Sequence, residues 1–169
     1  QYQSKPESIE VWTDSDFAGC QKSRKSTSGG IIRHGKHVIK SWSTNQAVVA
    51  LSSGEAEYHA LVKGASGAIG TTNLSMDLGV YFDGPIKAKA DASAAIGIAS
   101  RLGVGKVRHI EVNQLWLQGK VYEKKIEIIK VPTEEHIADV LTKAVDSTKL
   151  EWHIGAFNAW TSKDRQGLT

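Results

Sequence analysis

The first part of the chain alternates apolar and polar residues with the period of two that an extended strand requires. Residues 9–14 read IEVWTD, and segments 28–33 and 37–42 read as two more strands on either side of Gly35. Successive side chains of a strand point to opposite faces, so each segment has one face suited to a core. The pattern predicts an antiparallel meander with a turn at Gly35.

The pattern then changes to the period of a helix. Ser52 followed by Glu55 fits a capping box, in which the serine side chain accepts a hydrogen bond from a free backbone N–H and the glutamate reaches back. These residues predict a helix that begins after Ser52 and ends near Ile69.

The rest of the chain predicts a strand, two helices, another strand and a last helix. Their expected ranges are 86–90, 93–100, 108–118, 126–131 and 133–144. Pro132 stops the later strand, and Thr133 is placed to cap the last helix. Strands that return through helices lie parallel to the first. The order therefore predicts an α/β fold with a five-stranded mixed sheet, three strands antiparallel and the later ones parallel, flanked by α-helices.

The composition indicates one compact domain. The 169 residues are 40% hydrophobic and 23% charged, which is an ordinary globular balance. The lone Cys20 cannot form an internal disulfide and favours a reducing compartment. No apolar run approaches the roughly 18 residues of a membrane span. The absence of an initiator Met leads us to expect a segment of a longer protein, and the net charge of +3 selects no class of partner by itself.

Acidic residues stand where carboxylates are unfavourable without a partner, beginning with the first strand. Asp14 lies near the end of that strand, where Asp is disfavoured. It either begins the turn that follows or belongs to a site. Asp16 falls on the same side of an extended chain as Asp14 and is a weaker candidate for the same site.

Glu57 heads an apolar stripe on the first expected helix. The residues three, four, seven, eight and eleven positions further on are Ala60, Leu61, Gly64, Ala65 and Ala68. Such a stripe packs against a sheet, and a carboxylate on it requires a cation or hydrogen bonds. The alternative places Glu57 at the helix edge, in contact with water, whereas Glu55 already has a structural role in the cap.

Asp91 and Asp139 complete the candidate set. Asp91 directly follows the fourth strand, where an N-cap is the structural alternative, and Asp139 lies in the last expected helix, where a solvated acid is the alternative. Parallel strands end at one edge of a sheet, so these acids can converge there with Asp14 and Glu57. An all-oxygen cluster suits Mg²⁺. The sequence contains no zinc-ligand spacing, Walker loop or GxSxG motif.

Basic residues form three groups that together fit a phosphate-binding rim, although each group alone is ordinary surface. The groups are Lys22, Arg24 and Lys25; Arg33, His34, Lys36, His37 and Lys40; and Lys106, Arg108 and His109.

Six motifs follow one another along the chain: VWTDSDFAG, KSTSGG, SWSTNQAVVALSSGEAEYHAL, KADASAAIGIA, RHIEV and VPTEEHIADVLTK. In this order they resemble the ribonuclease H domain of copia-type long-terminal-repeat retrotransposon polyproteins, of the type I ribonuclease H superfamily. The resemblance implies an N-terminal extension over 1–8, a ribonuclease H domain over 9–157 and a C-terminal tail over 158–169. Gly30 departs from the pattern, because many relatives have an aromatic residue there.

The resemblance implies a ribonuclease H-like fold and an endoribonuclease that hydrolyses the RNA strand of RNA–DNA hybrids during reverse transcription. Position in the motifs implies that the catalytic and metal-binding residues are Asp14, Glu57, Asp91 and Asp139. Two Mg²⁺ ions, for which Mn²⁺ can substitute, would be held by these carboxylates. Asp16 and His136 are auxiliary candidates, the latter as the histidine that assists product release in cellular relatives.

Position in the fold also predicts the substrate contacts. Phosphates of the DNA strand are expected near Arg24, Lys25 and Thr27. Sugars of the RNA strand, read in the wide minor groove, are expected near Ser15, Asn45 and Ser93. The implied partners are an RNA–DNA hybrid and the reverse transcriptase domain of the same polyprotein, in a cytoplasmic retrotransposon particle without membrane attachment.

Three alternatives stay open. One is a weakly active or inactive ribonuclease H-like domain that tethers a polymerase or binds hybrid; another is a domesticated copy of low activity. The third is an integrase or transposase core that cuts DNA. Such cores typically carry their Glu late in the chain, whereas Glu57 is second in order here.

Overall fold

The computed structural model describes residues 6–103, 105, 110 and 115–158. Within them lies a five-stranded sheet with the order β3-β2-β1-β4-β5. β1 pairs antiparallel with β2, and β2 with β3, whereas β4 runs parallel to β1 and β5 parallel to β4. The strands are β1 (Ile9–Asp16), β2 (Thr27–His34), β3 (His37–Asn45), β4 (Ile86–Ala90) and β5 (Ile126–Lys130). The predicted mixed sheet is confirmed.

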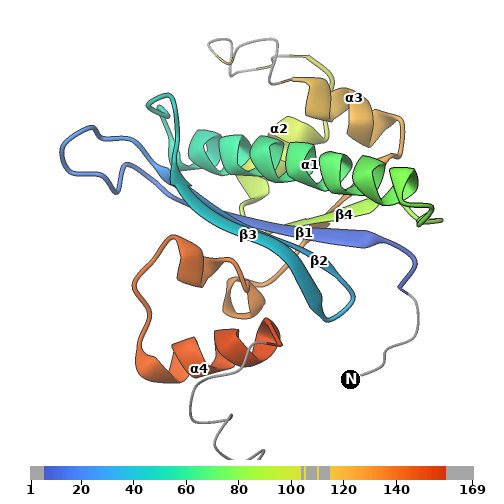
Figure 1. The fold of residues 1–169 in the computed structure, drawn as a ribbon. Coiled ribbons are helices and arrows are strands. Elements are labelled where there is room, and N and C mark those ends of the chain that lie inside the picture. The colour runs from blue at the N-terminus through green and yellow to red at the C-terminus, as the bar shows by residue number, and fades with distance from the viewer. Residues whose placement is uncertain (1–5, 104, 106–109, 111–114, 159–169) are drawn as a thin grey trace, which may run out of the picture.

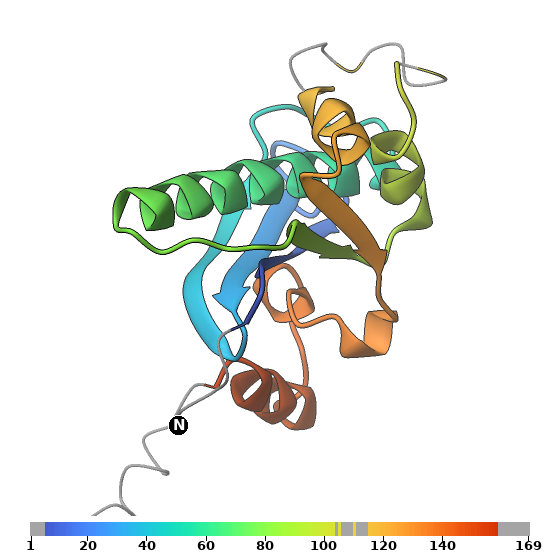
Figure 2. The same cartoon turned by 90° about the vertical axis from the view of Figure 1, so that its right-hand side faces the viewer.

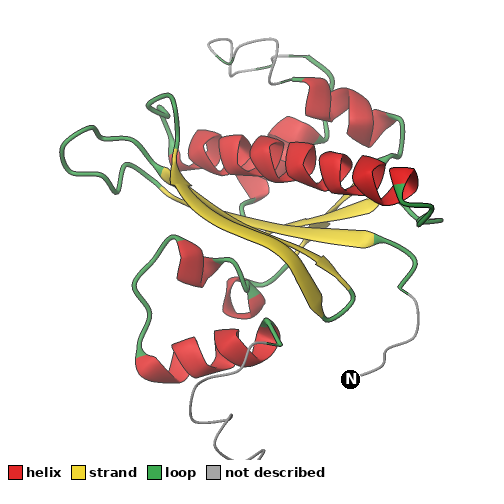
Figure 3. Ribbon diagram, viewed as in Figure 1, coloured by secondary structure: helices red, strands yellow, loops and turns green. Residues whose placement is uncertain are grey.

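Helices cover both faces of this sheet (Figure 1, Figure 3). One face carries α1 (Ser53–Asp77), α2 (Ser93–Ala99) and α3 (Trp116–Tyr122). The other carries α4 (Ser147–Ala156) and two short 3₁₀ helices, η2 (Thr133–Glu135) and η3 (Asp139–Leu141). Figure 2 shows the sheet as the middle layer between them. Among the described residues, no helix combines the length and the apolar character needed to cross a bilayer.

Alternation along β1 supplies a core to each face of the sheet. Ile9 and Val11 belong to the apolar cluster under α1, whereas Trp12 belongs to the cluster that includes residues of η3 and α4. Odd-numbered residues of β1 therefore face α1, and even-numbered ones face the opposite layer. Asp14 has the same parity as Trp12 and lies near the end of the strand, two residues before Asp16.

Small residues allow α1 to approach β1 closely. The predicted stripe on α1 is buried along its length. A Cβ added at Gly64 would lie 2.3 Å from Cγ2 of Thr13 and 3.0 Å from Cγ2 of Val11, so the spacing requires glycine. Glu57 lies about two turns earlier on the same helix. The close approach therefore brings Glu57 toward the end of β1.

The residue opposite Gly30 explains why a glycine stands at this position. Gly30 in β2 is the register partner of Trp42 in β3. A Cβ added at Gly30 would lie 2.1 Å from Cζ2 of Trp42. The indole ring from the neighbouring strand thus occupies the space beside the glycine.

The N-terminus of α1 has the predicted capping box, with one difference. Oγ of Ser52 accepts a hydrogen bond from the N–H of Glu55 at 3.2 Å. Oε2 of Glu55 accepts one from the N–H of Leu51 at 3.0 Å. The glutamate therefore reaches one residue further back than the cap residue itself.

Helix α1 ends at Asp77 rather than near Ile69 as predicted. The hydroxyls of Thr71, Thr72 and Ser75 each donate to the carbonyl four residues earlier, at 3.0, 3.0 and 2.9 Å. These side chains hydrogen-bond within the helix. They therefore do not draw its backbone into a turn, and the helix continues past them.

The helix predicted over 133–144 is wrong. The segment forms η2 and η3 instead, and His136 between them is extended, with ψ of 97°. His136, Ile137 and Ala138 are all buried. Three consecutive buried residues do not fit one face of a surface helix, so packing against the sheet overrides the helical pattern.

The remaining helices also differ from prediction. Of the helix expected over 108–118, residues 116–118 lie in α3, whereas residues 108, 109 and 111–114 lie outside the described residues. Helix α4 was not predicted, and it begins where Asp146 accepts a hydrogen bond from the N–H of Lys149 at 2.9 Å. Several predicted features lie outside the described residues: Lys106, Arg108, His109 and most of the two terminal extensions.

The spacing of α1 and β1 leads to a test of stability. Gly64→Ala is expected to lower the free energy of unfolding by roughly 1–3 kcal/mol, because the added methyl group pushes α1 away from β1. Gly70→Ala is the matched control on the same helix, where an added Cβ meets nothing within 4 Å. It should raise the free energy of unfolding by about 0.5–1 kcal/mol. Urea unfolding measures both, and equal stabilisation by both would contradict the close packing.

Candidate metal centre

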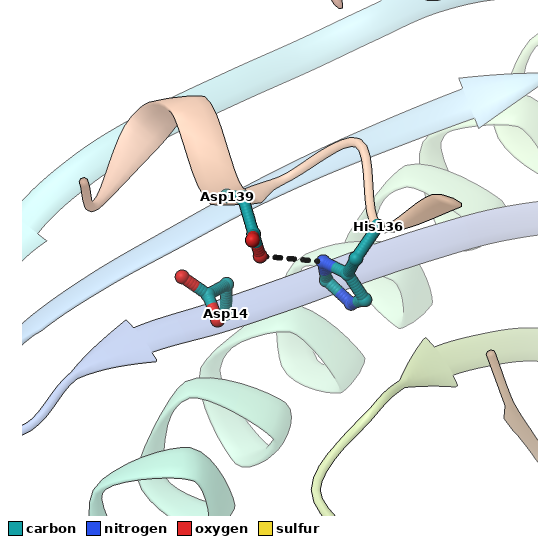
Figure 4. Close-up of side chains that lie close together, drawn as sticks. All are labelled: Asp14, His136 and Asp139. Carbon is teal, nitrogen blue, oxygen red and sulfur yellow. Dashed lines mark ion pairs between the residues drawn. The ribbon is translucent and has the colours of Figure 1, made fainter. Parts of the chain in front are cut away.

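Four acidic side chains from distant parts of the chain meet at one edge of the sheet. Asp14, Glu57 and Asp91 each offer a carboxylate oxygen, and these oxygens lie within 4.8 Å of one another. Asp14 and Asp139 form a second such group with His136. Figure 4 shows this second group, in which the carboxylates of Asp14 and Asp139 lie side by side. Asp14 is therefore shared by the two groups.

The parallel pairing of β1 and β4 explains why two of these acids meet. Trp12 and Lys89 are register partners in the two strands. Asp14 and Asp91 each lie two residues further along. Because parallel strands end at the same edge of a sheet, the two carboxylates arrive next to each other.

Asp14 is held from two sides and does not begin a turn. Its side chain lies within β1 and is 1% exposed. Oδ2 accepts a hydrogen bond from Oγ1 of Thr142, and Oδ1 lies 3.2 Å from Nζ of Lys143. Both partners follow η3, so the opposite layer fixes the orientation of this carboxylate.

Glu57 is the acid whose charge the site most disfavours. Burial, followed by the neighbouring carboxylates of Asp14 and Asp91, raises the pKa of Glu57 to about 9. The N–H of Ser15 donates to Oε1 of Glu57 at 3.2 Å, which orients the group. The stripe on α1 thus places Glu57 against the end of β1 instead of in open water.

Asp91 does not cap the helix that follows it. The N-cap of α2 is Ala92, which makes no side-chain capping bond. Oδ2 of Asp91 instead accepts a hydrogen bond from Oγ1 of Thr133 at 2.9 Å. This bond joins the end of β4 to η2.

Asp139 begins η3 and is half-buried. Its Oδ1 lies 3.5 Å from Nδ1 of His136 and 3.5 Å from Nζ of Lys143. Burial alone would raise the pKa of Asp139, but the contacts with His136 and Lys143 outweigh it and lower that pKa. Burial alone would lower the pKa of Lys143, but the contacts with Asp14 and Asp139 outweigh burial and raise that pKa.

His136, predicted as an auxiliary residue, lies buried beside Asp139. Its side chain is 1% exposed, and its ring meets the ring of Trp12 edge-on at 5.8 Å between centroids. This position suits a group that holds Asp139 in place (Figure 4).

The donor set fits a hard divalent cation. Carboxylate oxygens are the ligands that Mg²⁺ prefers. Oδ1 of Asp139 is buried and has no hydrogen-bond partner among the described residues. Burial, together with the neighbouring carboxylates of Asp14 and Asp91, raises the pKa of Glu57, so a bound cation would relieve an unfavourable charge there. Asp14, Glu57, Asp91 and Asp139 could therefore hold divalent cations in two neighbouring positions that share Asp14.

The residues predicted to bind phosphates lie in and after the β1–β2 loop. Arg24 is exposed and Lys25 partly so. Oγ1 of Thr27 donates to Oδ1 of Asn45 at 3.2 Å. A residue predicted to bind phosphates therefore contacts one predicted to bind sugars. Asp16 accepts a hydrogen bond from the N–H of Thr27; it orders this loop and lies outside both acidic groups.

The remaining residues predicted to contact sugars differ in exposure. The hydroxyl of Ser93 is exposed and accepts a hydrogen bond from Nζ of Lys130 at 2.7 Å. Ser15 is buried, and its backbone N–H donates a hydrogen bond to Glu57. Its contacts favour a role in positioning Glu57.

Three residues around the acids were missed by sequence reasoning. Thr142 and Lys143 contact Asp14 as described above; they end the motif VPTEEHIADVLTK, but no role was predicted for them from the sequence. Gln46 is buried, and its Nε2 donates to the carbonyl of Ala56 at 2.8 Å and to Oγ of Ser28 at 2.9 Å. Gln46 thereby ties the end of the meander to the first turn of α1.

Similarity to known proteins covers most of the chain. No protein-family model matches it. Over 144 residues, 85% of the chain, it is 30% identical to the "Retrovirus-related Pol polyprotein from transposon TNT 1-94" of Nicotiana tabacum. Over 145 residues it is 28% identical to the corresponding polyprotein from transposon RE1 of Arabidopsis thaliana. The chain spans 11% and 10% of the length of these relatives. They are of the kind that the motifs predict, so the predicted resemblance is confirmed.

Two solved structures share the fold. One is LC11-RNase H1 in complex with RNA/DNA hybrid, an enzyme isolated from compost; the TM-score is 0.51 at 19% identity, over 84% of this chain and 99% of that chain. The other is the N-terminal RNase H domain of rv2228c from Mycobacterium tuberculosis, with a TM-score of 0.50 at 17% identity, over 98% and 100%. At these identities the likeness shows the fold alone, which confirms the predicted ribonuclease H-like sheet.

The raised pKa of Glu57 leads to a test by pH. In the metal-free protein the folded state keeps a proton on Glu57 that the unfolded state loses above pH 4.5, so stability should fall as pH rises from 4.5 toward 9. Glu57→Gln removes this effect. The stability of this variant relative to wild type should therefore rise with pH, by at most about 1.4 kcal/mol per pH unit.

Guanidinium unfolding in EDTA between pH 5 and pH 9 measures this difference. The control is Glu151→Gln, which changes an exposed acid of α4 outside the centre. Wild-type and Glu57→Gln stabilities that stay parallel across this range would contradict the raised pKa.

Proposed function

We propose that this chain, which has the ribonuclease H fold and is homologous to a segment of retrovirus-related Pol polyproteins from transposons, is an endonuclease that hydrolyses the RNA strand of RNA–DNA hybrids. The observation that carries the proposal is the convergence of Asp14, Glu57, Asp91 and Asp139 at the edge formed by β1 and β4. Within a Pol polyprotein the reaction would belong to reverse transcription.

The four carboxylates would hold two Mg²⁺ ions, with Asp14 contributing to both positions. Bound ions of this kind supply an activated water for in-line attack and stabilise the leaving 3′-oxygen. Mn²⁺ would substitute, because it accepts the same oxygen ligands. The reaction requires no covalent nucleophile from the protein.

The chain's own groups orient these ligands. The N–H of Ser15 holds Glu57, the hydroxyl of Thr142 holds Asp14, and the hydroxyl of Thr133 holds Asp91. Fixed ligands lower the reorganisation needed to reach the reactive geometry. His136 would position Asp139 through its Nδ1, which lies 3.5 Å from Oδ1 of that carboxylate.

The charge distribution suits a polyanionic substrate. Four of the 18 acidic residues lie in the centre, which leaves 14 acidic residues elsewhere, whereas the whole chain has 21 basic residues and, of these, Lys143 contacts the centre. Lys25 and the exposed Arg24, in the loop beside the centre, would bind DNA-strand phosphates. Asn45 and Ser93 would meet the 2′-hydroxyls of the RNA strand.

The polyprotein relatives support two further proposals. The partner in the same polyprotein would be a reverse transcriptase domain, and the chain would act inside a cytoplasmic retrotransposon particle. An inactive tether is disfavoured, because an inactive copy has no need to keep the acids, and all four stand together here.

The proposal is tested with labelled RNA–DNA hybrid, double-stranded RNA and double-stranded DNA, each in Mg²⁺, Mn²⁺ or EDTA. We expect cleavage of the hybrid alone, abolished by EDTA. Asp91→Asn should lower the rate by at least about a hundredfold, because it removes an ionised metal ligand. Asp16→Asn is the matched control: it keeps the Oδ1 acceptor for Thr27 and should retain most of the activity. Full activity of Asp91→Asn, or equal cutting of duplex DNA, would overturn the assignment.

A further inference from the structure

We propose that Lys143 is the internal counter-ion of the acidic centre and that a divalent cation must displace it in order to bind. The proposal rests on the metal site of the proposed function. Nζ of Lys143 lies 3.2 Å from Oδ1 of Asp14 and 3.5 Å from Oδ1 of Asp139. The ammonium group thus lies against both carboxylates of the second acidic group.

The ammonium and a metal ion compete for the same atoms. Asp14 is 1% exposed, so its carboxylate has little access to water as an alternative partner. An ion bound between Asp14 and Asp139 would use the oxygens that Lys143 now contacts. Two like charges held a few ångströms apart at a partly buried site repel strongly, so the two occupants exclude each other.

Lys143 has room to leave. Its side chain is 44% exposed, whereas that of Asp14 is 1% exposed. It lines an open hollow of about 520 Å³ together with Glu134, Asp146 and Lys149. Release of the ammonium therefore requires rotation of one long side chain into water, without movement of the sheet or of η3.

Asp14 stays in place when Lys143 leaves. Its other oxygen, Oδ2, accepts the hydrogen bond from Thr142, and the backbone that carries the carboxylate is paired in β1 with β2. The ligand is therefore kept in position while its charge partner changes. As a consequence, the contact with Lys143 raises the concentration of free divalent cation needed to fill the centre.

The test is the affinity for Mn²⁺ and Mg²⁺ in the absence of nucleic acid, measured by isothermal titration calorimetry. Lys143→Met removes the competing charge and keeps a long side chain, so it should bind either ion roughly three- to tenfold more tightly than wild type. Lys149→Met removes a charge from the same hollow; Lys149 forms no ion pair with the four acids among the described residues. This variant and Lys143→Arg, which keeps the charge, should bind as wild type does.

A second measurement uses the wild-type chain and therefore tests the proposal even if a variant does not fold. Acetylation of Lys143, followed by mass spectrometry, should become faster when Mg²⁺ is added, while acetylation of Lys149 should not change. Equal or weaker metal affinity of Lys143→Met, or a Lys143 acetylation rate that does not respond to Mg²⁺, would overturn the inference.

The outcomes separate this inference from the proposed function. Tighter metal binding by Lys143→Met in a chain that cuts no hybrid would support the counter-ion and contradict the nuclease. Hybrid cleavage by the wild-type chain, with a metal affinity that Lys143→Met leaves unchanged, would support the nuclease and contradict the counter-ion.

Discussion

Repulsion among carboxylates that are close together and shielded from water is the constraint on which this centre depends. Oxygens of Asp14, Glu57 and Asp91 lie within 4.8 Å of one another, and so many negative charges cannot coexist there without compensation. The metal-free protein meets this constraint in two ways. Glu57 keeps its proton well above the usual pH for a carboxyl group, and Asp14 lies against the ammonium of Lys143. Both arrangements are ones that a bound divalent cation would replace.

The fold creates this crowding by bringing both layers to the same edge of the sheet. Parallel pairing of β1 with β4 places Asp14 beside Asp91, and the close approach of α1 at Gly64 adds Glu57 from one layer. The opposite layer adds Asp139 through η3. The hydroxyls of Thr142 and Thr133 then bond across from this layer to the acids at the strand ends. The packing on the two faces of the sheet therefore positions the four acids as well as stabilising the fold.

The sequence predicted the parts of this arrangement that depend on short-range patterns. Alternation along β1 and the small-residue stripe after Glu57 are properties of single elements, and they were sufficient to predict the sheet and to select Glu57 over Glu55. The region after Pro132 was not predictable in this way, because the burial of His136 against Trp12 depends on the assembled sheet. The role of Lys143 was missed for the same reason: its contact with Asp14 joins residues 129 positions apart.

In the proposed function, the acids form two adjacent divalent-cation positions with Asp14 as their common ligand. The most direct measurement is anomalous diffraction from crystals of this chain grown with Mn²⁺ and an RNA–DNA hybrid that resists cleavage. Two manganese peaks are predicted, both within coordination distance of Asp14, with Glu57 and Asp91 on one side and Asp139 on the other. Manganese bound away from Asp14, or absent from this edge of the sheet, would contradict the claim.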